Sequence, residues 1–79
     1  MMINKLSNIS LIEYRRFLIH LGCKQYKIKG GHEHWTRADF LRPITLQTHI
    51  DPVPEFIVKQ HALILGLSKN DFIDSFNKM

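Results

Sequence analysis

Residues 27–37, which read KIKGGHEHWTR, decide the fold of this 79-residue chain. Apolar and polar side chains alternate on both sides of Gly30 and Gly31, and a period of two is typical of half-buried β-strands. Glycine adopts positive φ without steric cost, so the glycine pair predicts a tight hairpin turn. We therefore expect two antiparallel strands, one beginning near Cys23 and one running from His32 to Arg37.

The alternation also predicts which side chains share a face of the sheet. The face toward the helices is expected to take Tyr26, Ile28, Glu33 and Trp35. The opposite, open face is expected to take Lys27, Lys29, His32, His34 and Thr36, joined by Thr45 and Gln47 from a third strand. Imidazole and ammonium groups are thus expected close together on a surface that faces solvent.

A helix is predicted before the hairpin. Ser10 and Glu13 form the S-x-x-E pattern of a capping box at its start, and Gly22 supplies a left-handed end. Apolar residues at three- and four-residue spacing give one buried stripe: Leu11, Tyr14, Phe17, Leu18 and Leu21. Arg15 and Arg16 fall off this stripe and are expected to face water.

After the hairpin, the sequence predicts a third strand and two more helices. The strand is RPITLQTH, residues 42–49. One helix covers about residues 54–65 and ends at Gly66, and Ser68 caps the last helix. The order α-β-β-β-α-α predicts an α+β domain, in which a three-stranded antiparallel sheet carries its helices on one face.

Length and composition are those of one small folded domain. Apolar residues make up 44% of the chain and charged residues 23%, so residues 1–79 are expected to form a single domain. The longest apolar run, residues 62–65, is far too short to span a bilayer, and MMINKLSNIS lacks the apolar core of a signal peptide. The lone cysteine, Cys23, favours a reducing compartment. We therefore expect a cytoplasmic protein with no membrane partner.

The net charge of +4 and the expected open face favour a nucleic-acid partner. An imidazole has an ordinary pKa near ~6.5, so at neutral pH it can take a proton from a ribose hydroxyl or give one to a leaving oxygen. Neighbouring lysines would stabilise negative charge on phosphorus, and the backbone amides of a glycine turn can hold a phosphate oxygen. This chemistry needs no cofactor, because RNA supplies its own nucleophile.

Each of these features also has a simpler explanation. A Gly-Gly hairpin is often only a turn, and a basic strand face is often only solvated. His32 and His34 could provide two ligands of a zinc site. The remaining ligands would have to come from His49, His61, Asp51 or Cys23. No metal-ligand spacing links those residues, so no metal is predicted, and the residues alone indicate a small basic α+β domain.

The chain as a whole resembles the HicA family of toxin–antitoxin ribonucleases. The resemblance rests on an ordered set of features between about Ser10 and Phe76. These are the leading amphipathic helix, the glycine-histidine turn in KIKGGHEHW, the strand RPITLQTH, and the helix, Gly-Leu-Ser break and final helix in VKQHALILGLSKNDF. The resemblance implies a fold like that of double-stranded-RNA-binding domains, with its core at about residues 10–76.

The same resemblance implies an endoribonuclease toxin (an mRNA interferase) that cleaves mRNA without a metal, inhibits translation and is neutralised by a HicB-type antitoxin. The histidine after the glycine turn is required for activity in the family, and His32 occupies that position here. RNA-binding residues are then expected to be Lys27, Lys29, Gly30, Gly31 and His34. An RNA-binding module without catalysis and, less simply, a metal-binding protein are the alternatives.

This chain departs from the family pattern at two places. Many members carry serine at the position of Gly31, so any role of that hydroxyl is absent here. The turn ADFL, residues 38–41, is more apolar than the usual Asp-Gly type. If exposed, Phe40 and Leu41 would be a candidate docking spot for the antitoxin.

Overall fold

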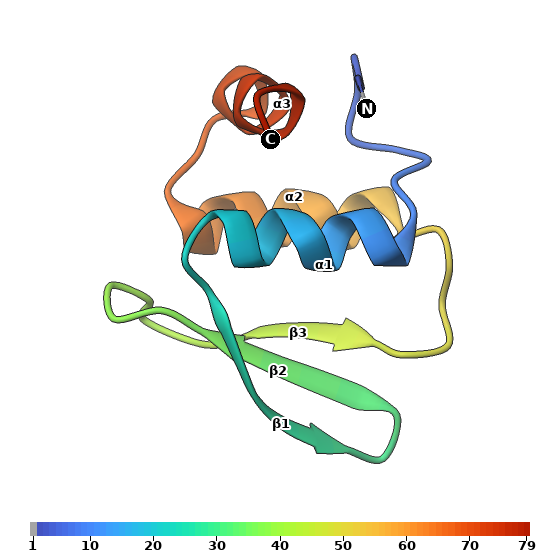
Figure 1. Cartoon of the computed structure of the whole chain (residues 1–79), viewed down its shortest axis with the longest axis vertical. Coiled ribbons are helices and arrows are strands. Elements are labelled where there is room, and N and C mark those ends of the chain that lie inside the picture. Colours follow the sequence, from blue (N-terminus) through green and yellow to red (C-terminus); the bar gives the residue numbers. More distant parts are fainter. Residues whose placement is uncertain (1) are drawn as a thin grey trace.

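A three-stranded antiparallel sheet and three helices make up the fold in the structure, a computed structural model that describes residues 2–79. The helices are α1 (Leu11–His20), α2 (Glu55–Leu65) and α3 (Lys69–Asn77). The strands, in sheet order, are β1 (Lys24–Lys29), β2 (His32–Thr36) and β3 (Ile44–Gln47). Helices α1 and α2 cover one face of the sheet, and α3 lies on their far side (Figure 1). The predicted α+β class and element order are therefore confirmed.

The helix ends follow the sequence signals. The Ser10 hydroxyl accepts a hydrogen bond from the Glu13 backbone N–H at 3.2 Å, and the Ser68 hydroxyl accepts one from the Asp71 N–H at 3.1 Å. Each cap satisfies a donor that the first helical turn leaves without a partner. At the end of α2, Gly66 takes the left-handed conformation that the sequence predicts, with φ of 72°.

The hairpin between β1 and β2 turns at the glycine pair, as expected. Gly30 and Gly31 have φ of 57° and 79°. Residues with a side chain are strained at such positive φ, whereas glycine is not. The turn fixes the register, in which Lys29 lies opposite His32 and Lys27 opposite His34. Opposite residues of an antiparallel pair lie on the same face, so these four side chains are neighbours.

The predicted inward placement of Tyr26 is wrong, because β1 carries a bulge. The register shifts between Gln25 and Lys27, so that Gln25 lies opposite the buried Trp35. A bulge sets two residues, here Gln25 and Tyr26, against one residue of the partner strand, so Gln25 takes the inward position and the ring of Tyr26 lies beside His34. Tyr26 is 55% exposed.

The predicted burial of Ile28 is also wrong, for a different reason. Ile28 lies opposite the buried Glu33, so the register does place it on the helix side of the sheet. The distal end of β1 runs out from beneath the helices, however (Figure 1). None of the described helices covers this corner, and the Ile28 side chain remains 63% exposed.

Arg15 does not simply face water as predicted. Its guanidinium donates hydrogen bonds to both carboxylate oxygens of Glu33, which is buried between α1 and the sheet. The Glu33 carboxylate also accepts bonds from the Gln25 amide at 3.0 Å and the Trp35 indole N–H at 3.2 Å. A buried carboxylate needs such partners, and here they come from α1, β1 and β2. The network therefore joins the helix to the hairpin.

The core is centred on aromatic rings that join α3 to α1. The Phe17 ring centroid lies 4.8 Å from that of Phe72 and 5.1 Å from that of Phe76. Burying each such ring contributes roughly 1.5–3 kcal/mol. The core also extends further toward the N-terminus than residue 10, since Leu6 and Ile9 are buried within it. The segment that carries Leu6 and Ile9 therefore belongs to the packed domain.

Candidate functional site

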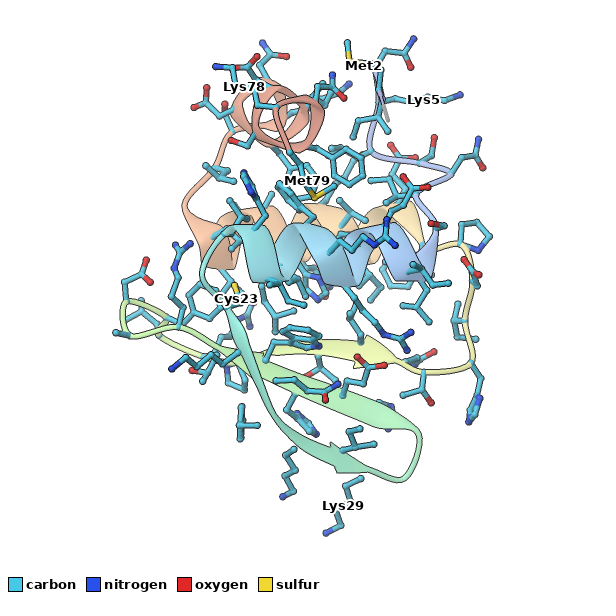
Figure 2. All side chains as sticks on the ribbon, in the orientation of Figure 1. Met2, Lys5, Cys23, Lys29, Lys78 and Met79 are labelled. Carbon is cyan, nitrogen blue, oxygen red and sulfur yellow. The ribbon has the colours of Figure 1, made fainter. Side chains whose placement is uncertain are left out.

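The open face of the sheet brings together the imidazoles and lysines that the sequence singles out. Glu33 and Trp35 point into the core, so His32 and His34 of the same strand point the other way. Their partners across the hairpin, Lys29 and Lys27, share that direction. Figure 2 shows Lys29 projecting from the side of the sheet opposite the helices.

The imidazole of His32 is held against the turn that precedes it. His32 Nδ1 lies 3.2 Å from the carbonyl oxygen of Gly30. A carbonyl only accepts, so Nδ1 carries the proton of this hydrogen bond. In the neutral ring Nε2 is then the atom with a free lone pair. The turn thus sets both the position of the ring and the atom that can act as a base.

His34 occupies a different environment on the same face. Its Nδ1 lies 3.3 Å from the hydroxyl oxygen of Thr45 on β3, and its ring centroid lies 6.2 Å from that of Tyr26. The side chain is half-buried, whereas that of His32 is exposed. The two imidazoles are therefore distinct in their partners, and His34 is the less accessible.

The glycine turn is held by Thr48, the residue that directly follows β3. The Gly31 carbonyl accepts hydrogen bonds from the Thr48 backbone N–H at 2.8 Å and from the Thr48 hydroxyl at 3.1 Å. A Cβ built on Gly31 would lie 3.5 Å from the His49 ring, whereas one built on Gly30 would meet nothing within 4 Å. Space would therefore allow a side chain at either position, and the positive φ is what favours glycine.

The carboxylate of Glu33 stays ionised behind the open face. Burial opposes its charge, but the hydrogen bonds from Arg15, Trp35 and Gln25 outweigh that cost and hold the pKa of Glu33 below its ordinary value. Glu33 lies between His32 and His34 in sequence and is fixed to α1. The strand that carries both imidazoles is therefore anchored on its inner side.

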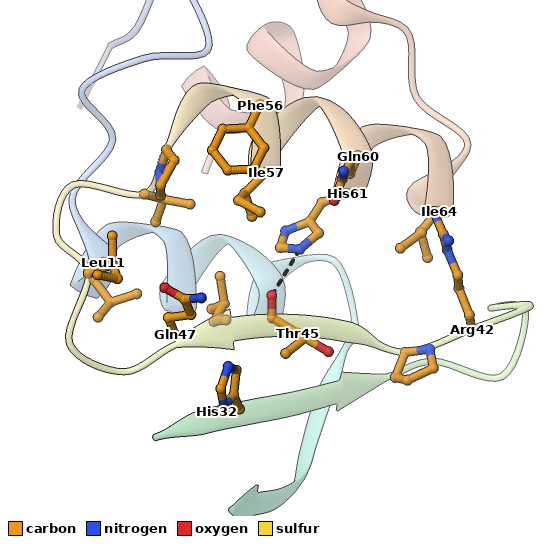
Figure 3. Close-up of a pocket in the computed structure, with 15 residues that line it drawn as sticks. Leu11, His32, Arg42, Thr45, Gln47, Phe56, Ile57, Gln60, His61 and Ile64 are labelled. Carbon is orange, nitrogen blue, oxygen red and sulfur yellow. Dashed lines mark hydrogen bonds between the residues drawn. The ribbon is translucent and has the colours of Figure 1, made fainter. Parts of the chain in front are cut away.

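A groove that the sequence analysis missed lies between β3 and α2, with a volume of about 560 Å³. Phe56, Ile57 and Gln60 line it from α2, as Figure 3 shows, and Arg42 lies at one end. His32 also borders it, below β3 in this view. The sequence feature that indicates this groove is Phe56, an exposed aromatic residue outside the buried stripe of its helix.

His61 lines the inner wall of this groove and has a structural role. Its Nε2 donates to the Thr45 carbonyl at 3.1 Å, drawn as the dashed line in Figure 3, and its Nδ1 accepts from the Tyr14 hydroxyl at 2.7 Å. Burial lowers the pKa of His61 to about 4. The ring is therefore neutral at physiological pH, and it links α1, α2 and β3.

Within residues 2–79, no group of three or more His, Cys, Asp and Glu side chains is placed to hold a metal ion. The residues that would have had to complete a zinc site with His32 and His34 are therefore not assembled. No helix in the described part of the chain is long and apolar enough to cross a bilayer.

Comparison of the chain with models of known protein families, with curated proteins and with solved structures gives no match.

Proposed function

We propose that this chain is a metal-independent endoribonuclease of the HicA type that cleaves mRNA in the cytoplasm. The observation that carries the proposal is the placement of His32. Its ring is exposed beside a glycine turn, Nε2 has the free lone pair, and Lys27 and Lys29 share its face. The resemblance of the sequence to HicA toxins, at the same histidine, supports the same reaction.

In the proposed reaction His32 Nε2 takes the proton of a ribose 2′-hydroxyl. The 2′ oxygen attacks the adjacent phosphorus, the bond from phosphorus to the 5′ oxygen breaks, and that oxygen leaves with a proton from water or from His34. The products are a 2′,3′-cyclic phosphate and a 5′-hydroxyl. Lys27 and Lys29 stabilise the negative charge on the phosphoryl oxygens, and no cofactor takes part.

The arrangement of the elements supports the proposal of a fold like that of double-stranded-RNA-binding domains. Such a fold needs an antiparallel three-stranded sheet with helices on one face, and α1 and α2 lie on one face of the sheet here. In this proposal the uncovered face, which carries the histidines, is the one that meets RNA.

A HicB-type antitoxin is the proposed protein partner, and Leu41 is a stronger candidate contact than Phe40. Phe40 is half-buried against the core, and the Arg37 guanidinium lies 5.0 Å from its ring centroid. Leu41 is fully exposed and borders a shallow depression together with Leu63 of α2, which is also exposed. A partner that covered these side chains would remove apolar surface from water.

The test of the nuclease is cleavage of RNA by purified protein in the presence of EDTA. His32→Ala should reduce the rate at least about 100-fold, the lower end of what a general base contributes. Its circular dichroism spectrum and RNA affinity should stay close to those of the wild type, because the ring is exposed. His20→Ala, which removes an exposed imidazole at the end of α1, is the matched control.

Undiminished cleavage by His32→Ala would reject this assignment. A non-catalytic RNA-binding module is the second candidate, favoured by the glycine at position 31 where many HicA proteins have serine. It predicts salt-dependent RNA binding with no cleavage products from the wild type.

A further inference from the structure

Tyr26 is an aromatic side chain that the proposed reaction leaves unused. Its ring is 55% exposed, and its aromatic neighbour is His34, at 6.2 Å between centroids with 46° between the ring planes. None of the side-chain hydrogen bonds among residues 2–79 involves its hydroxyl. Among residues 2–79 the ring therefore has one aromatic neighbour and no hydrogen bond of its own, and more than half of its surface is open to solvent.

The bulge in β1 is what turns Tyr26 to the open face. Without it, the alternation would have placed Tyr26 opposite Trp35 and under the helices; with it, Gln25 takes that place. Bulges re-aim single side chains and are over-represented beside functional sites. The strand thus gives up an apolar contact with the core and gains an exposed ring next to the candidate active site.

The charge around Tyr26 is suited to a polyanion. Strand β1 contributes Lys24, Lys27 and Lys29, all exposed. The one acidic residue of the three described strands is Glu33, which is buried toward α1 and paired with Arg15. Phosphates approaching this face would therefore meet ammonium groups without an opposing carboxylate on the strands.

From this arrangement we infer that Tyr26 is a stacking platform for an unpaired RNA base, beside His34 and next to the nucleotide at His32. An exposed ring beside backbone-binding lysines is the combination by which proteins hold single-stranded nucleic acid. A base held in a duplex is stacked on its neighbours and cannot cover the ring. The inference deepens the proposed function, because it says that the substrate is single-stranded at the nucleotide that flanks the scissile phosphate. It rests on the proposed function only for the statement that cleavage occurs at that phosphate.

The test measures binding with a probe that cannot be cleaved by internal attack. The probe is a fluorescein-labelled oligoadenylate with 2′-O-methyl groups, compared with the same backbone lacking its bases and with the corresponding duplex. Tyr26→Ala should weaken binding of the base-bearing single strand about tenfold, the order expected for one lost base–aromatic stack. It should leave binding of the abasic strand unchanged.

Two variants separate stacking from other causes. Tyr26→Phe keeps the ring and should bind the base-bearing strand within about twofold of the wild type, since stacking needs only the aromatic face. Ile28→Ala shortens a similarly exposed side chain of the same strand, on the other side of the sheet, and should also bind normally.

The inference is overturned if the wild type does not bind the base-bearing strand, if Tyr26→Ala binds it normally, if the loss is equal on the abasic strand, or if Tyr26→Phe loses as much as alanine. Cleavage is scored separately on unmodified RNA. Tyr26-dependent binding without any cleavage would keep this inference and reject the nuclease. If the wild type cleaves RNA and Tyr26→Ala binds the base-bearing strand normally, the nuclease is kept and this inference is rejected.

Discussion

Arg15 on α1 and Glu33 on β2 form a bidentate ion pair on the helix side of the strand that carries both candidate histidines. The Arg15 Nε lies 3.1 and 3.0 Å from the two carboxylate oxygens of Glu33, and the Glu33 side chain is only 2% exposed. Removing one partner of such a pair leaves the other charge buried without compensation. The pair therefore links the stability of the domain to the placement of the open face.

Arg15→Met should lower the free energy of unfolding by roughly 2 kcal/mol, less than for a fully buried pair because Arg15 is partly open to solvent. Equilibrium urea denaturation measures the change. Arg16→Met is the matched control: its neighbouring guanidinium is exposed, so its loss should cost less than about 0.5 kcal/mol. Equal effects of the two substitutions would show that the Glu33 contact contributes nothing specific.

His61 should make stability depend on pH between about 4 and 6.5. Burial lowers its pKa to about 4 in the folded protein, whereas an unfolded histidine titrates near ~6.5. Across this window the unfolded chain binds the extra proton, so stability rises with pH and falls as the solution is acidified. The span corresponds to roughly 3 kcal/mol.

Urea denaturation at pH 7 and pH 5 checks this slope in the wild type and in His61→Gln. The variant should be less stable at pH 7, because the Tyr14 and Thr45 bonds are disturbed, and should lose less stability on acidification. His20→Gln, which removes an exposed histidine outside this network, is the matched control. A His61→Gln slope equal to that of the wild type would assign the pH dependence to another group.

Lys27 and Lys29 should contribute to RNA affinity through phosphate contacts. Each such contact releases a counterion, so Lys27→Ala or Lys29→Ala should reduce the slope of log affinity against log salt by about 0.7 for single-stranded RNA. Titrations of RNA at several salt concentrations provide the slopes. Lys59→Ala on α2 is the control: its ammonium lies 3.7 Å from Glu55, away from the open face. If Lys59→Ala reduces the salt slope as much as the strand variants do, the RNA does not bind specifically to the open face.

Gly31→Ser would introduce the residue that many proteins of the HicA family, which the sequence resembles, carry before the histidine, at a cost in stability. The new Cβ would make an ordinary 3.5 Å contact with His49, so the cost arises from φ of 79°. We expect about 1 kcal/mol, the lower end for a residue with a side chain in this region. Thermal or urea unfolding measures it, with Gly30→Ser as the comparison of similar cost. If Gly31→Ser is fully stable, the turn does not require glycine.

The local pattern of the sequence was sufficient for the elements of the fold. Caps at Ser10 and Ser68, the left-handed Gly66 and the glycine hairpin are properties of a few neighbouring residues, and the structure has each of them. The hairpin register also follows from the turn alone, which is why the sequence could place Lys27, Lys29, His32 and His34 on one face.

Other features depend on contacts between segments that are distant in sequence. The bulge at Tyr26 arises where Gln25 joins the Glu33 carboxylate, and that carboxylate is in turn paired with Arg15 on another element. Strand alternation and helical spacing both ignore such a network. Alternation therefore placed Tyr26 inside, and the spacing of the apolar stripe on α1 placed Arg15 in water. The groove beside α2 likewise exists only because β3 and α2 approach each other.

By itself, then, the sequence determined the element order, the helix ends and the mounting of His32 after a tight turn, because short-range sterics and hydrogen bonding decide them. Only the tertiary structure decided the direction of Tyr26, the partner of Arg15 and the neutral state of His61. Those depend on burial, which raises the cost of an unpaired charge or polar group until some distant residue satisfies it.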